Sequence, residues 1–310
     1  MSQKTRHLLM IEPTCFGFNS QTAVNNYYQQ SLSELTPSKI QQKALAEFSV
    51  FVEKLKENGV NVITVKSSLK QKTPDAIFPN NWVSFHENGT VALYPMFAPN
   101  RRLERRDDII QLLKTQYNFK ITNIQDYSKQ EKNNLFLEGT GSLILDRENK
   151  ICYAAISERT SLNLVLKFCE DFSYSAVYFT AYQTVKNKRL PIYHTNVMLC
   201  IADHYAIVCL DAIDNQLERQ KIQDSLLKSR KKIIEISENQ VNQFAGNMLQ
   251  VIGDKTYLVM STRAYNSLNE NQKNTISNFN PILHSNLETI EKIGGGSARC
   301  MMAEIFCSLL

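Results

Sequence analysis

A pattern of hairpin, helix and strand recurs along this 310-residue chain at a nearly constant interval. The residue that enters each hairpin is Asn81, Glu138, His194 and Asn247, and Cys300 occupies the same place near the end, so the steps are 57, 56, 53 and 53 residues. A period of this size predicts stacked or radially arranged units. If the units surround an axis, these five residues would meet at one central site.

The units are predicted from local patterns. Hairpins are expected where strand-forming runs flank turn residues, and they cover 82–94, 142–157, 195–210 and 248–261. Amphipathic spacing predicts helices over 40–55, 108–117, 161–172 and 217–227, and strands are predicted at 60–65, 175–180 and 232–236. A last helix is predicted over 301–306. Because no linker or low-complexity segment interrupts the series, we expect one domain over residues 1–310.

Composition excludes several classes of protein. Hydrophobic residues make up 43% and charged residues 21%, as in ordinary globular proteins, and the net charge of +5 is scattered rather than gathered on one face. Because the charge is scattered, nucleic acid is not an expected partner. A membrane is not expected either, since no apolar run approaches the ~20 residues of a membrane span. Seven cysteines without a CxxC pair indicate neither a disulfide framework nor a zinc site. We expect a cytoplasmic protein without metal or cofactor.

The segment before Cys300 carries the first chemical signal. Cys300 follows the glycines 294–296 and Ser297-Ala298-Arg299. A glycine loop lets backbone N–H groups approach a substrate, and a helix beginning at this point would favour a thiolate. The alternative is a phosphate cradle or a flexible turn before a packed helix, although the lysine of a P-loop is absent.

Three further residues suit a thiol nucleophile. His194 could act as its general acid and base, although a histidine at a strand start is often a structural hydrogen-bonder. Glu138 lies between apolar residues and glycines, where the backbone leaves room for a ligand, or it is an ordinary turn acid. Asp75 is either a substrate contact or a loop residue.

Taken together, these segments resemble the amidinotransferase, or guanidine-modifying, superfamily, which includes arginine deiminase, dimethylarginine dimethylaminohydrolase and glycine amidinotransferase. The resemblance spans essentially the whole chain and rests on Pro74–Asn81, Leu137–Gly139, His194–Asn196 and Gly294–Cys300. Other segments, including Asn80–Trp82, Asn100–Arg102 and Ser157–Thr160, are most similar to the citrulline-utilisation branch, a citrulline hydrolase or ureidase.

The resemblance implies the pentein fold, an α/β five-bladed propeller of ββαβ modules with pseudo-fivefold symmetry. It also implies that Cys300 attacks the guanidino or ureido carbon, that His194 protonates the departing nitrogen and then activates water, and that Glu138 holds the substrate nitrogens. The substrate-binding residues that it implies, with Arg101 and Arg159 on the α-carboxylate, are Asp75, Asn80, Asn81, Arg101, Arg159, Asn196 and Asn247.

Two departures from the arginine deiminase pattern bear on the substrate. Asn81 and Asn196 stand where that pattern has aspartates, and burying a guanidinium cation requires compensating negative charge. An asparagine offers a donor and an acceptor, which suits a neutral ureido group. We therefore predict a hydrolase of linear C–N bonds acting on citrulline, with ornithine, ammonia and carbon dioxide as products.

Two alternatives remain open from the sequence. One is arginine or dimethylarginine hydrolysis or amidino transfer on the same fold, and the other is a non-catalytic pentein that binds a partner. The second predicts loss of the nucleophile or its partners, yet Cys300, His194 and Glu138 are all present. The sequence does not determine the oligomeric state and leaves a homodimer open.

Overall fold

The computed structural model describes residues 2–31, 34–68 and 70–310. These residues form five three-stranded sheets and a separate two-stranded hairpin. In every three-stranded sheet the middle strand is antiparallel to one neighbour and parallel to the other. The connection between the two parallel strands contains one or two helices. The sequence repeat therefore corresponds to five units of one topology.

Four units are continuous in the chain. The first unit contains η1 Pro79–Asn81, β3 Val83–Phe85, β4 Thr90–Leu93, η2 Pro99–Glu104, α2 Asp107–Thr115 and β5 Asn123–Asp126. The second contains η3 Ser128–Asn133, α3 Gly139–Ser142, β6 Ile144–Asp146, β7 Ile151–Ala155, α4 Leu162–Phe172 and β8 Ser175–Phe179. The third contains η4 Thr195–Val197, β11 Leu199–Ile201, β12 Tyr205–Val208, η5 Leu210–Ala212, α5 Gln216–Lys228 and β13 Lys232–Glu235, and the fourth contains α6 Glu238–Val241, β14 Leu249–Ile252, β15 Thr256–Ser261, α7 Thr262–Ser267, α8 Glu270–Ser277 and β16 Ile282–Ser285. The extra hairpin is β9 Tyr182–Val185 and β10 Lys188–Pro191.

The fifth unit joins the two ends of the chain. Helix α9 (Glu288–Gly294) and the turn η6 (Ala298–Met301) lead into β17 (Ala303–Ile305), which pairs antiparallel with β1 (His7–Glu12). The unit then continues through α1 (Pro37–Glu57) to β2 (Asn61–Lys66), which is parallel to β1.

The predicted helix over 301–306 is therefore wrong. Ala303 and Ile305 pack in a buried cluster with Leu9 and Ile11 of β1 and with β3. A helix here would leave one edge of β1 without backbone hydrogen bonds, and pairing with β17 satisfies them. The thiolate stabilisation expected from that helix does not apply either, because Cys300 lies in a short 3-10 turn.

Helix α1 illustrates how local sequence forms these units. Thr36 caps its N-terminus by accepting a hydrogen bond from the Lys39 N–H, and Pro37 stands at the first helical position. The apolar residues predicted at spacings of three and four form its buried face. Gly59 follows the C-terminus with φ +78°, and a side chain there would collide with the backbone of Asp254.

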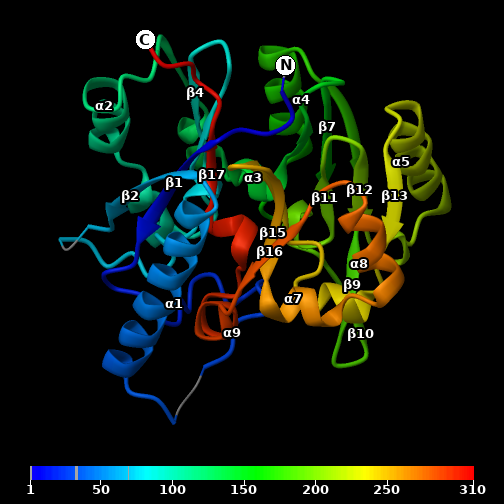
Figure 1. Ribbon diagram of the computed structural model, residues 1–310, viewed down its shortest axis with the longest axis horizontal. Coiled ribbons are helices and arrows are strands. Elements are labelled where there is room, and N and C mark those ends of the chain that lie inside the picture. Colours follow the sequence, from blue (N-terminus) through cyan, green and yellow to red (C-terminus); the bar gives the residue numbers. More distant parts are fainter. Residues whose placement is uncertain (1, 32–33, 69) are drawn as a thin grey trace.

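The arrangement is visible in Figure 1, where α1, α2, α4, α5 and α8 lie toward the outside and strands such as β11, β15 and β17 lie further in. The short elements α3 and η6, which precede first strands, lie near the middle of the view. Four predicted hairpins, four predicted helices and three predicted strands agree with the structure to within a few residues. In the part of the chain that is described, no helix has the length and apolar character to cross a membrane.

Candidate active site

The repeat brings its five in-phase residues to the starts of the five first strands. Asn81 ends η1, Glu138 and His194 directly precede α3 and η4, Cys300 lies within η6, and Asn247 precedes β14. Turn α3 contacts η1 and η4, and η1 contacts η6. All five side chains are buried, with Cys300 4% exposed and Glu138 fully enclosed.

The sulfur of Cys300 lies between two side-chain amides. Nδ2 of Asn196 and Nδ2 of Asn247 each donate a hydrogen bond to Sγ over 3.3 Å. The orientation of Asn247 is determined because its Oδ1 accepts from the Arg299 N–H at 3.0 Å. Two amide donors stabilise a thiolate more than a neutral thiol, because hydrogen bonds to a charged acceptor are stronger.

His194 and Glu138 form a hydrogen-bonded pair. Nε2 of His194 lies 2.7 Å from Oε2 of Glu138, whose other oxygen accepts from the Phe97 N–H at 3.0 Å. A carboxylate accepts only, so Nε2 carries the proton and Nδ1 of the neutral ring is free to take one. Nδ1 faces Gly141, where an added Cβ would lie only 2.8 Å from it.

The charges around this pair set its protonation. Burial lowers the pKa of His194 to about 4, although the Glu138 carboxylate acts in the opposite direction. Burial by itself would raise the pKa of Glu138, but Arg159, the His194 hydrogen bond and Arg101 outweigh it and hold that pKa below its usual range. At neutral pH the pair is therefore a neutral imidazole and a carboxylate.

Arg101 and Arg159 both approach Glu138. Their Nη1 atoms lie 3.9 Å and 3.5 Å from its Oε2. Arg101 also donates to both carboxylate oxygens of Glu104 and to Oδ1 of Asn81. The predicted contact of both guanidinium groups with a substrate α-carboxylate stays a prediction.

Four predicted substrate-binding side chains contain buried polar atoms without a hydrogen-bond partner among the described residues. These atoms are Oδ1 of Asp75, both amide atoms of Asn80, Nδ2 of Asn81 and Oδ1 of Asn196. Leaving a buried polar group unpaired costs about 1–3 kcal/mol, so such groups rarely cluster without a function. Asn196 contacts Cys300, and Asn81 and His194 both lie against Gly141, which supports a site for a small polar ligand here.

Sequence reasoning missed residues 19–25, which contact two predicted substrate-binding residues. Asn19 Nδ2 donates to Asp75 Oδ2 at 2.7 Å, and Asn25 Oδ1 accepts from Nε of Arg159 at 2.9 Å. This segment has no strand or helix periodicity, so only its amide-rich composition could have indicated it. Tyr193 was also missed, although its ring packs 4.8 Å from the Arg159 guanidinium beside His194.

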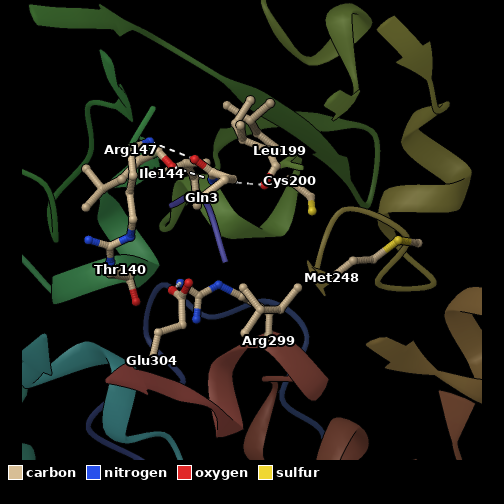
Figure 2. Close-up of a pocket in the computed structure, with 12 residues that line it drawn as sticks. Gln3, Thr140, Ile144, Arg147, Leu199, Cys200, Met248, Arg299 and Glu304 are labelled. Atoms are coloured by element: carbon tan, nitrogen blue, oxygen red, sulfur yellow. Dashed lines mark hydrogen bonds and ion pairs between the residues drawn. The ribbon is translucent and has the colours of Figure 1, made fainter. Parts of the chain in front are cut away.

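The cavity in Figure 2 lies beside two turns of the candidate site, α3 and η6. Thr140 and Arg299 come from those turns and line it, whereas Cys300, His194 and Glu138 do not. Its volume of about 20 Å³ has room for roughly one water molecule. Gln3 closes one side through hydrogen bonds to the carbonyls of Leu145 and Ile201.

Solved structures share this fold. ArgZ, an arginine dihydrolase from the ornithine-ammonia cycle in cyanobacteria, superposes with a TM-score of 0.74 at 17% identity, and the match covers 98% of this chain and 41% of ArgZ. The chain thus spans about two fifths of that protein's length. The N-terminal domain of ArgZ with bound product gives 0.71 at 16% identity and 97% and 99% coverage. An adduct of dimethylarginine dimethylaminohydrolase with S-methyl-L-thiocitrulline gives 0.61 at 14%, covering 96% and 99%.

These matches confirm the predicted pentein fold. No curated protein matches the sequence significantly. A family model, however, described as N,N dimethylarginine dimethylhydrolase, eukaryotic, matches residues 12–307. That match covers nearly the whole chain and confirms the predicted superfamily, which includes dimethylarginine dimethylaminohydrolase. The chain therefore belongs to the N,N dimethylarginine dimethylhydrolase family.

Proposed function

We propose that this protein hydrolyses citrulline to ornithine, ammonia and carbon dioxide, with Cys300 as the nucleophile. The choice of citrulline as the substrate rests on the orientation of the Asn81 side chain. Arg101 has donors only, so it must face Oδ1 of Asn81, and the observed bond is 2.8 Å. The amide NH2 of Asn81 is therefore left for the ligand. A ureido C=O can accept from it, whereas a guanidinium group has no acceptor.

Asn196 supports the same substrate. Its Nδ2 donates to Cys300 Sγ, and its buried Oδ1 has no partner in the described part of the chain. Oδ1 can accept from the NH2 of a ureido group. The two asparagines thus offer one donor and one acceptor to a neutral group that presents one of each.

The charge of the surrounding cluster also favours a neutral group. Burial raises the pKa of Asp75, and it raises the pKa of Glu104 to about 7 despite Arg101. Glu104 is thus less ionised at neutral pH than an exposed carboxyl group. Arg101 and Arg159 already neutralise much of the remaining negative charge near Glu138. A buried guanidinium would find little uncompensated charge.

We infer a two-step hydrolysis. Sγ of Cys300 attacks the ureido carbon as Nδ1 of His194 takes the thiol proton. The bond from that carbon to the ornithine nitrogen then breaks, and His194 returns the proton to that nitrogen, which leaves an S-carbamoyl cysteine. His194 next removes a proton from water, which attacks the carbonyl and releases the thiolate. The resulting carbamate decomposes to ammonia and carbon dioxide.

A second candidate is hydrolysis of arginine. Solved structures of the same fold include an arginine dihydrolase, and Glu138 and Asp75 could hold guanidinium nitrogens. The two substrates differ in whether the reacting group is charged. Their relative rates therefore separate the candidates.

The test is a substrate screen with purified protein. Citrulline, arginine, agmatine and methylated arginines are supplied to wild type, to Cys300→Ser and to Cys15→Ser, which changes a partly exposed cysteine outside the site. We expect ornithine and ammonia from citrulline with wild type and Cys15→Ser, and none with Cys300→Ser. Faster release of citrulline from arginine than of ornithine from citrulline would refute the proposal.

A further inference from the structure

A buried carboxyl group contacts the segment that carries the nucleophile. Glu291 lies in α9 and is fully enclosed. Its Oε1 accepts a 2.5 Å hydrogen bond from the hydroxyl of Ser297. The Ser297 carbonyl in turn accepts from the N–H of Cys300 at 3.0 Å. One side chain therefore lies between the end of α9 and the turn that holds the nucleophile.

The backbone of Glu291 holds the same segment at a second point. Its carbonyl accepts from the N–H of Gly295 at 3.0 Å, and Gly295 has φ +64°. Tyr193, the neighbour of His194, donates from its hydroxyl to the Gly295 carbonyl at 2.8 Å. The glycines allow this tight turn but supply no side chains to hold it. Glu291 is the only residue with an ionisable carboxyl group in these described contacts.

We propose that Glu291 is a positioning residue for the nucleophile, acting through Ser297 to hold Cys300 Sγ against the amides of Asn196 and Asn247. This inference rests on the proposed role of Cys300. It does not depend on which ureido or guanidino compound is the substrate.

The ionisation of Glu291 falls near neutral pH. Burial raises its pKa to about 7, against the opposing effects of Ser261, Ser297 and Arg263. Arg263 lies in α7, and Glu47 of α1 raises the pKa of Glu291, as burial does. Glu291 and Arg263 are also among the residues around a groove of about 640 Å³.

The direction of the pH effect follows from hydrogen-bond strength. A carboxylate accepts a hydrogen bond about twice as strong as a neutral carboxyl or amide does. Above pH 7 the ionised Glu291 therefore holds Ser297 more tightly, and Sγ keeps its two amide contacts. Below pH 7 the protonated group holds it less tightly. The difference corresponds to about fivefold in the fraction of molecules in which Sγ is correctly placed.

The experiment measures alkylation of Cys300 by iodoacetamide, followed on its own peptide by mass spectrometry. Wild type is compared with Glu291→Gln, Ser297→Ala and the double variant at pH 6 and pH 8. Glu288→Gln is the control, because Glu288 is an exposed acid of α9 bound only to Lys292 in its described side-chain contacts. Thermal unfolding at both pH values shows whether each variant folds.

We expect wild type and Glu291→Gln to react equally at pH 6 and wild type to react about fivefold faster at pH 8. In the Ser297→Ala background, Glu291→Gln should have no further effect, since the contact is already absent. Equal effects at both pH values, or in both backgrounds, would overturn the proposal. A lower melting temperature with an unchanged alkylation profile would show a structural role only and would overturn it too.

The same measurement keeps this inference apart from the proposed substrate. If alkylation follows the expected pH profile but citrulline is not hydrolysed, the substrate proposal fails and the role of Glu291 stands. If citrulline is hydrolysed and the profile of Glu291→Gln matches wild type, the role of Glu291 fails instead.

Discussion

The side-chain amide of Asn247 donates a 3.3 Å hydrogen bond to the sulfur of Cys300. Its oxygen is held by the N–H of Arg299 in the same turn. The donor therefore cannot rotate away without breaking a second bond. Asn247 and Cys300 are one repeat apart, so the contact links two neighbouring units.

Replacing Asn247 by alanine should lower the reactivity of Cys300. Loss of one hydrogen bond to a charged acceptor costs about 1.5 kcal/mol, so alkylation by iodoacetamide at pH 7 should slow about tenfold. Asn247→Asp should slow it further, because a carboxylate beside the sulfur opposes the thiolate. The exposed Asn266→Ala is the control. An unchanged rate in Asn247→Ala would mean that the amide does not stabilise the thiolate.

Gly141→Ala should lower turnover strongly. The new Cβ would lie 2.5 Å from Nδ2 of Asn81 and 2.8 Å from Nδ1 of His194, so one of them must move. A displacement of about 1 Å in a catalytic group can cost about a hundredfold in rate, measured here as kcat with citrulline. The matched control is Gly17→Ala, because a Cβ at Gly17 meets no described atom within 4 Å. Similar activity in both variants would contradict the geometry.

The buried His194 should make stability depend on pH. Its folded pKa of about 4 lies below the ordinary 6.5, so between these values the unfolded chain binds a proton that the folded chain does not. Stability should therefore rise with pH across this window, by on the order of 3 kcal/mol.

His194→Gln should remove this part of the dependence of the unfolding free energy on pH, since glutamine does not titrate. Urea unfolding from pH 4 to pH 7 measures that free energy, and His204→Gln on an exposed turn is the control. Identical slopes in wild type and His194→Gln would show that His194 does not carry the effect.

Asn81→Asp should shift preference toward a cationic substrate. The aspartate can still accept from Arg101, but it replaces the amide donor with an acceptor and adds negative charge. We expect the ratio of kcat/KM for arginine to that for citrulline to rise at least about tenfold, or about 1.4 kcal/mol. Asn88→Asp adds the same charge on the exposed hairpin turn of this unit. A ratio that falls or stays constant would contradict the proposal that the Asn81 amide favours a neutral substrate.

Local patterns were sufficient for most of the fold. The buried face of α1, the hairpin at Asn88-Gly89 and the helices 107–115 and 162–172 follow from apolar spacing and turn residues, which depend on near neighbours in sequence. The helix predicted at 301–306 failed for the opposite reason. The pairing partner of β17 is β1, almost 300 residues away, and no local pattern contains that information.

The period of the repeat determined by itself that Asn81, Glu138, His194, Asn247 and Cys300 occupy equivalent positions. Only the tertiary structure decided which atoms meet. It pairs His194 with Glu138 and directs two amides at the sulfur of Cys300. It also surrounds Arg101 with Glu104 and Asn81. Sequence periodicity specifies which residues are equivalent, whereas side-chain orientation and hydrogen-bond partners depend on contacts between units that are distant in the chain.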